Sequence, residues 1–240
     1  MAFGPERNTV IARQAREAAV VDVGLRQYML GVYNYMASGL ALTGIVAAVV
    51  AMSPGLQAAI FGTPLMWVAI LAPIALVFFL SFRVHKMSAA AAQATFWLYA
   101  ALNGIAFSTI FLFYTSESVA RVFFITAATF AGMSLYGYTT KRDLSGIGSF
   151  LFMGLIGILI AMLVNLFLAS SALQFAISVI GVVIFTGLTA WDTQRIKEWY
   201  IEGDDRELVG KKSVMGALTL YLDFINLFVM LMQLLGVRRE

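Results

Sequence analysis

The sequence contains no cysteine and a single histidine, His85, among 240 residues. Without cysteine, the chain cannot form disulfide bonds, carry out thiol catalysis or bind a metal through thiolates. One histidine is too few for a histidine-rich zinc site. These absences exclude a disulfide-stabilised extracellular domain and the common zinc centres.

Charged residues are also scarce, at 12% of the chain, whereas hydrophobic residues make up 61%. An ordinary soluble domain carries about twice that share of charge. Windows without any charge cover 31–82, 87–116, 122–140 and 144–191, and 213–237 contains only Asp223. Each window is long enough to cross a bilayer, and the two longest are long enough to cross twice. The composition therefore excludes a soluble enzyme or a nucleic-acid-binding protein and indicates a polytopic, all-α membrane protein.

We expect seven transmembrane helices, because the apolar runs do not alternate in hydrophobicity as the strands of a membrane barrel do. Their predicted bounds are 31–52, 64–82, 91–114, 119–138, 147–169, 172–194 and 214–236. This divides the chain into an N-terminal tail over 1–30 and a single transmembrane domain over 31–236.

Lysine and arginine residues indicate the orientation of these helices. Of the 16 basic residues, 13 lie in the tail or in the gaps after the second, fourth and sixth helices. Basic loops remain on the cytoplasmic side, so we expect a cytoplasmic N-terminus and a carboxyl terminus on the far side. Arg238 and Arg239 at the carboxyl end leave open a last helix that re-enters the membrane.

Two acidic residues, Asp192 and Asp223, lie inside predicted membrane helices. A carboxylate at bilayer depth costs about 2.5–3.5 kcal/mol, so it normally faces the interior of a helical bundle. Counted from the gap that joins their helices, the two lie about 10 Å and about 15 Å from the same membrane surface. We expect the carboxyl groups to meet, to share a proton and to titrate as a coupled pair. A purely structural hydrogen bond between the helices is the alternative interpretation.

Other polar residues share the faces of the two aspartates, which predicts a wet or protein-lined centre. Those expected to line a pore are Thr189, Thr219, Asn226 and Gln233. Carboxylate oxygens suit Ca²⁺ or another hard cation, but two carboxylates fall short of the roughly six to eight oxygens that Ca²⁺ prefers. We therefore expect weak, transient calcium binding at Asp192 and Asp223, as conduction requires, and no resident cofactor.

Several basic and aromatic residues lie near the predicted cytoplasmic surface. Arg83, at the end of the second helix, is either a group that holds the aspartate pair closed or a positive-inside anchor. His85 would titrate near neutral pH if it were exposed. Trp191 and Trp199 are most simply aromatic anchors at the membrane interface.

Two segments resemble the signature sequences of the Bax inhibitor-1, or transmembrane Bax inhibitor motif, family. They are Gly-Leu-Thr-Ala-Trp-Asp-Thr-Gln-Arg-Ile-Lys at 187–197 and Ala-Leu-Thr-Leu-Tyr-Leu-Asp-Phe-Ile-Asn-Leu-Phe at 217–228. The resemblance extends over residues 22–236. It implies six helices around a central polar seventh helix, and a pH-sensitive calcium leak gated by an aspartate pair that matches Asp192 and Asp223. The family's latch arginine best matches Arg83.

The sequence departs from its bacterial relatives in one respect, since 64–82 lacks the acidic residue that they often carry in the second helix. This departure weakens the case for a second cation site. By resemblance we expect a location in a bacterial inner membrane. We expect a monomer whose partners are the lipid bilayer, calcium ions and protons.

Two other functions compete with the leak. Some bacterial relatives are thought to modulate a membrane-bound quality-control protease, so a non-conducting regulator that acts through the polar tail is the main alternative. An intramembrane aspartyl protease also carries two membrane aspartates, but its Gly-x-Gly-Asp motif and its later Pro-Ala-Leu motif are missing here. We therefore expect no enzymatic activity.

Overall fold

The computed structural model describes the backbone of residues 5–239 and the side chains of residues 23–239. Its helices are α1 (Pro5–Met52), α2 (Pro54–Phe61), α3 (Leu65–Arg83), the 3-10 turn η1 (Val84–Lys86), α4 (Ala89–Phe113), α5 (Ser116–Thr139), α6 (Ser145–Leu168), α7 (Ser171–Glu198) and α8 (Arg206–Leu235). Within this part of the chain the only β-structure is an isolated bridge between Tyr114 and Arg238. The predicted all-α class is confirmed.

Seven of the described helices are long and apolar enough to cross a membrane, as the sequence predicts. The first span extends back past residue 31 at least to Val23, where the described side chains begin, and Tyr28 and Met29 on this part of α1 are buried in the bundle. The helix itself continues back to Pro5, through a part of the predicted tail whose side chains lie outside the described residues. The last helix begins at Arg206 rather than at residue 214, where the Asp205 side chain caps its first turn. Both helices thus extend beyond the uncharged windows that reveal them in the sequence.

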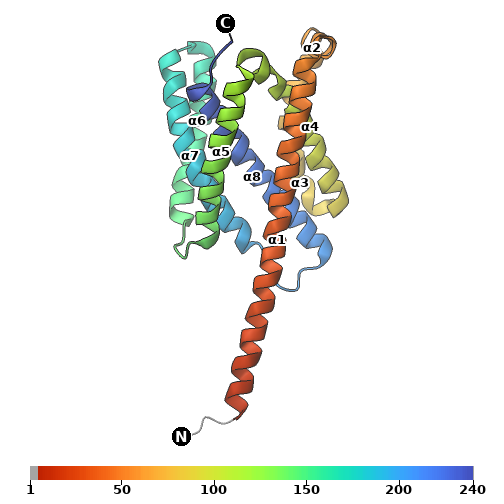
Figure 1. The fold of residues 1–240 in the computed structure, drawn as a ribbon, viewed down its shortest axis with the longest axis vertical. Coiled ribbons are helices and arrows are strands. Elements are labelled where there is room, and N and C mark those ends of the chain that lie inside the picture. Colours follow the sequence, from red (N-terminus) through yellow and green to blue (C-terminus); the bar gives the residue numbers. More distant parts are fainter. Residues whose placement is uncertain (1–4, 240) are drawn as a thin grey trace.

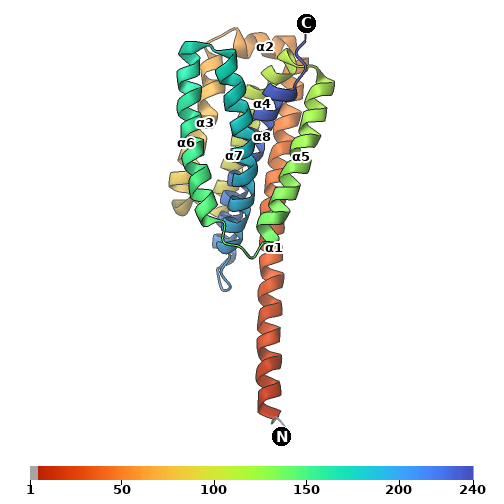
Figure 2. The ribbon, with the colours of Figure 1, turned by 90° about the vertical axis from the view of Figure 1, so that its left-hand side faces the viewer.

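The short helix α2 is absent from the sequence-based prediction. Pro54 stands in its first turn, where the missing backbone N–H has no helical partner to lose, and the helix ends at Gly62. It buries none of its residues and lies across one end of the bundle (Figure 2). The proline and glycine that divide the apolar run therefore lie at the two ends of a short helix rather than in an open loop.

Helix α8 is the most buried of the spans and runs through the middle of the bundle (Figures 1 and 2). α1, α4, α5 and α7 pack against it, while α3 and α6 pack mainly on α4 and α7 and lie further out. Tyr221 fixes α8 in this place, since its ring meets the edges of Phe96 and Tyr99 and its hydroxyl lies 2.7 Å from Thr43 Oγ1. The central last helix implied by the resemblance is present.

The two ends of the chain lie at opposite ends of the bundle, and the first half of α1 projects beyond it (Figure 1). Beyond α8 the chain pairs with the α4–α5 turn, where Thr115 N donates to Val237 O and Arg239 N donates to Phe113 O, each at 2.9 Å. The last helix therefore crosses the whole bundle, and the re-entrant alternative is wrong. The connections after α3, α5 and α7, together with the helix ends beside them, carry nine of the 16 basic residues. They share the end from which α1 projects, here called the basic end (Figure 1). A cytoplasmic location of this end stays a prediction.

Candidate cation site between α7 and α8

Asp192 of α7 and Asp223 of α8 meet inside the bundle, although their helices run in opposite directions. They are only 7% and 5% exposed, and both side chains line the same cavity, where each influences the charge of the other. Two ionised carboxylates in one buried place repel each other, so we expect one proton to be shared between them. The structure thus brings the two predicted residues together inside the bundle, and the shared proton stays a prediction.

The aspartate pair lies in the wall of a cavity of about 500 Å³. The cavity is lined by α3, α6, α7 and α8, and most of its lining is apolar. The charged and polar lining residues are Asp192, Arg195, Thr219, Asp223 and Asn226. A space of this size accommodates several water molecules, and only polar groups would hold them there. All of the polar lining comes from α7 and α8, so these two helices give the cavity its chemistry.

Arg195 is the basic residue nearest to the pair, and sequence reasoning missed it. It lies three residues after Asp192, one turn further along α7, and its charge acts on the Asp192 carboxyl group. Its guanidinium group lies over the rings of Trp191 and Trp199, at 5.4 Å and 5.7 Å from their centroids. Trp191 also lines the cavity, so it is part of the site rather than only an interface anchor. The spacing of three residues between Asp192 and Arg195 places both on one face of a helix, and this pattern could have identified Arg195 from the sequence.

Thr193, the next residue of the signature segment, anchors α7 to α5. Its Oγ1 donates to Thr189 O at 2.7 Å and lies 3.0 Å from Ser134 Oγ. Ser134 in turn lies 2.6 Å from the hydroxyl of Tyr33 on α1. This chain of hydroxyl groups connects α1, α5 and α7. Thr189 is fully buried behind the cavity wall rather than in its lining.

Gln194, the third residue of that segment, holds the connection between α5 and α6. Its Oε1 accepts a hydrogen bond from Leu144 N at 2.9 Å, and its Nε2 donates to Arg142 O at 2.8 Å.

In the loop between α5 and α6, hydrogen bonds from Ser145 lower the pKa of the exposed Asp143 below its usual value. Asp143 therefore stays ionised at neutral pH and does not act as a second pH-sensitive carboxyl group.

The predicted pore residues of α8 separate into two groups. Thr219 and Asn226 line the cavity, and each donates to a carbonyl group of its own helix, at 3.1 Å to Met215 O and at 2.8 Å to Leu222 O. Gln233 lies about two turns beyond Asn226, outside the cavity. The cavity therefore takes in only part of the polar face of α8.

Gln233 belongs instead to a cluster of amide and hydroxyl side chains, here called the amide cluster. Its Oε1 accepts hydrogen bonds from Gln174 Nε2 at 2.7 Å and from Ser178 Oγ at 2.6 Å. Asn165 Nδ2 donates to Gln174 Oε1 at 3.1 Å, which extends the cluster to α6. The amide cluster lies beyond the cavity, on the side away from the basic end.

Arg83 lies at the end of α3 with its side chain exposed. Among residues 23–239 it makes no hydrogen bond or ion pair, and it does not line the cavity. His85 follows it in η1 and is exposed as well. The structure thus places Arg195, and not Arg83, beside the aspartates.

The pair provides few ligands for a cation. Asp223 Oδ2 is shielded from solvent and has no hydrogen-bond partner in the described part of the chain. Over the same residues, no group of three or more His, Asp or Glu side chains is placed to hold a metal ion. Such a donor set suits a passing hard cation that keeps part of its water shell better than a permanently bound one.

Comparisons with known proteins agree with this architecture. A family model described as "Inhibitor of apoptosis-promoting Bax1" matches residues 25–240. The chain is 53% identical over 222 residues to an uncharacterized protein of Rickettsia prowazekii, covering 91% of this chain and 93% of that protein. It is 49% identical over 219 residues to the inner membrane protein YbhL of Escherichia coli, covering 90% and 94%. An uncharacterized protein of Caulobacter vibrioides is 45% identical over 230 residues, covering 92% of each chain.

These matches span the whole transmembrane bundle and both signature segments. The name of the E. coli relative agrees with the predicted location in the bacterial inner membrane. The chain is therefore a multi-pass membrane protein that belongs to the Bax inhibitor-1 family.

Proposed function

We propose that this protein is a pH-sensitive leak channel for calcium or a similar hard cation, with Asp192 and Asp223 as its gate. The observation that carries the proposal is the pair of buried carboxyl groups that meet in the wall of a cavity between membrane-spanning helices. Buried ionisable groups at this depth are costly, and in membrane proteins they commonly belong to ion or proton pathways.

The shared proton supplies the switch. With one proton, the hydrogen bond between the carboxyl groups holds α7 to α8 across the cavity. Without it, two negative charges lie together in a buried place and repel each other unless a cation enters. Protons and cations therefore compete for the same oxygens, so the affinity for a cation rises as the pair loses its proton.

Arg195 is the group that we expect to bias this switch. Its positive charge acts on Asp192, and stacking on Trp191 and Trp199 holds it in position. A latch at Arg83 remains the alternative from the family resemblance and would require α3 to bring that exposed side chain to the cavity.

The route from the cavity to the far side passes Met230 in this proposal. Met230 lines the cavity and packs against Gly181 of α7, and Gln233 of the amide cluster lies about one turn beyond it. A methionine side chain is flexible and can move aside. A cation leaving the aspartates would then meet the amide oxygens before reaching the far surface.

The proposal is tested by measuring calcium flux into proteoliposomes at about pH 6 and about pH 8, on either side of neutrality. Wild-type flux should change between these conditions. Asp223→Asn should show no change and should stay at the level of the acidic wild type, because asparagine imitates the protonated carboxyl group. Flux equal to that of empty liposomes at both pH values would reject the channel.

His85 provides the control, because histidine is the side-chain type that usually titrates in this range. His85→Gln should keep the wild-type pH response. Loss of the response in this variant alone would assign the pH sensitivity to the exposed η1 turn and not to the aspartates.

A second candidate function, a non-conducting regulator of a membrane protein such as a quality-control protease, is favoured by the projecting part of α1 (Figure 1). This segment extends past the bundle and is available for a partner. Deletion of residues 1–20 separates the two functions, because a leak should persist, whereas regulation through the tail should fail.

A further inference from the structure

Helices α1 and α5 border a groove in the outer wall of the bundle, on the opposite side of α8 from the aspartates. α1 packs on α4 and α8, whereas α5 packs on α7 and α8, so the two helices leave a space between them. A cavity of about 610 Å³ occupies this space, and all of its lining residues belong to α1 and α5. Several of them, including Leu30 and Leu135, are exposed on the outer surface. The groove is therefore open sideways, toward the lipid of a membrane.

The length of the groove matches one leaflet of a bilayer. Along α1 it extends from Arg26 to Leu40, which corresponds to about 21 Å of helix. Half of a bilayer, with its headgroups, is about 20–22 Å thick. A single phospholipid from the leaflet at the basic end would fill the groove from end to end.

The body of the groove is apolar. Its apolar lining residues are Met29, Leu30, Met36, Ala37, Leu40, Phe130, Ala131 and Leu135. Tyr33 and Ser134 interrupt this surface, but their hydroxyl groups lie 2.6 Å apart and satisfy each other. Below its mouth, the surface of the groove is thus suited to bind an acyl chain.

Positive charge gathers at the mouth of the groove. Arg26 is the first lining residue along α1, at the end of the groove toward the basic end of the bundle, where a lipid headgroup would lie. Tyr138 lines the same end, and Lys197 Nζ donates to its carbonyl oxygen at 2.9 Å while lying 5.3 Å from the centroid of its ring. Basic side chains at this level of a membrane attract anionic lipids.

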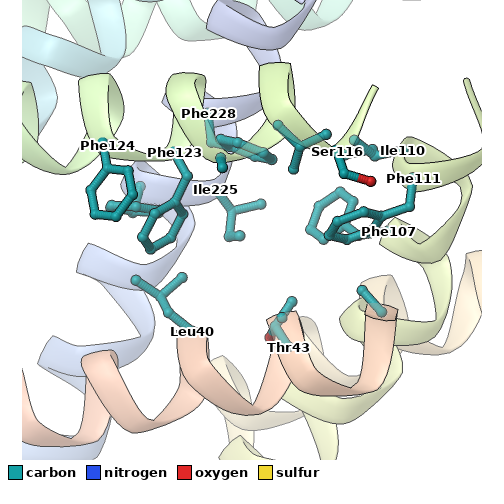
Figure 3. Close-up of a pocket in the computed structure, with 15 residues that line it drawn as sticks. Leu40, Thr43, Phe107, Ile110, Phe111, Ser116, Phe123, Phe124, Ile225 and Phe228 are labelled. Atoms are coloured by element: carbon teal, nitrogen blue, oxygen red, sulfur yellow. The ribbon is translucent and has the colours of Figure 1, made fainter. Parts of the chain in front are cut away.

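At its other end, the groove meets a second cavity of about 260 Å³, and Leu40 lines both. Figure 3 shows the phenylalanine side chains of this second cavity gathered above Leu40 and Thr43 of α1. Those labelled are Phe107, Phe111, Phe123, Phe124 and Phe228. This cavity is lined almost wholly by apolar groups and can take the end of an acyl chain.

We propose that the α1–α5 groove binds one anionic phospholipid, with its phosphate at Arg26 and an acyl chain that runs past Ala37 to Leu40 and the phenylalanine-lined cavity. The charged mouth, the apolar body and the length of one leaflet together fit this occupant. Neither calcium conduction nor the aspartate pair enters into this inference, so it stands or fails separately.

The test is native mass spectrometry of the purified full-length protein after incubation with equal amounts of phosphatidylglycerol and phosphatidylcholine. The wild type should retain one phosphatidylglycerol in preference. Arg26→Gln should lower the retained ratio of the anionic to the zwitterionic lipid by about fivefold. Ala37→Trp should fill the groove and abolish retention of both lipids.

Two matched variants serve as controls. Arg206→Gln removes an exposed arginine from the basic end, and Ala94→Trp adds the same bulk to an exposed position of α4. Neither residue lines the groove, so both variants should retain lipid as the wild type does. Equal retention of the two lipids by the wild type, or an Arg206→Gln effect as large as that of Arg26→Gln, would overturn the proposal. Lipid retention by Ala37→Trp would also overturn the proposal. A wild type that is a lipid-free dimer would overturn it as well.

Discussion

Helix α8 separates two cavities of opposite character. On one side, Asp223 and Asn226 face a cavity shared with α3, α6 and α7. On the other side, Phe224 and Phe228 face an apolar cavity shared with α1, α4 and α5. Successive residues on a helix differ by about 100° in direction, so one position along the chain is enough to change from a buried acid to a buried aromatic ring. A single central helix can thus present acidic and amide groups to one cavity and aromatic rings to another while it keeps the two apart.

The largest effect is expected when this separation is broken by placing charge on the apolar side. Phe224 is 3% exposed, and its ring lies 5.6 Å from the ring centroids of both Phe123 and Phe130. Phe224→Asp should lower the free energy of unfolding by about 3 kcal/mol, because the new carboxylate has no partner there. Thermal unfolding in detergent measures this, with Phe224→Leu as the apolar control. Equal melting temperatures for the two variants would show that both faces of α8 tolerate charge alike.

A smaller effect is expected from crowding the polar cavity. Gly148 of α6 lies against the indole ring of Trp191, and a methyl group at this position would overlap the ring. Gly148→Ala should therefore cost about 1–3 kcal/mol of stability. Gly146 lies two residues earlier on the same helix and faces open space, so Gly146→Ala should be neutral or slightly stabilising. Thermal unfolding that gives the same stability for both variants would mean that the indole moves aside without cost.

The smallest effect is expected from substitution of Arg195, because this residue influences the titration of the aspartate pair but is not one of the two carboxyl groups. Arg195→Gln removes a positive charge that favours the ionised form of the aspartate pair, so the midpoint of the pH response should move to higher pH. Because Arg195 is exposed to solvent, the shift should be at most about one pH unit. Arg195→Lys keeps the charge and should shift the midpoint less. A flux titration measures both variants, and an unchanged midpoint in Arg195→Gln would return the latch role to Arg83.

Much of the bundle could be predicted because the membrane restricts what a sequence can do. Uncharged windows identified the spans, and the two aspartates stood out because acids are rare at that depth. Helical spacing also predicted that Thr219 and Asn226 share the face of Asp223, and both line the cavity with it.

The remaining features depend on packing that no single helix reveals. Tyr28 and Met29 precede residue 31 and are nevertheless buried in the core, which only the packing of α1 on other helices reveals. The groove exists because α1 and α5 diverge, which the spacing of apolar residues within either helix does not indicate. Gln233 shares a helical face with Asp223 but lies too far along α8 to reach the same cavity.

The central claim is that Asp192 and Asp223 share one proton and that a cation replaces it. Infrared spectroscopy of the reconstituted protein tests this most directly, because a protonated carboxylic acid has a C=O stretching band that an ionised carboxylate lacks. At neutral pH we expect this band in the wild type, its loss on addition of Ca²⁺, and its absence from the Asp192→Asn/Asp223→Asn double variant. A wild type without the band at neutral pH, or a band that persists in the double variant, would contradict the shared proton.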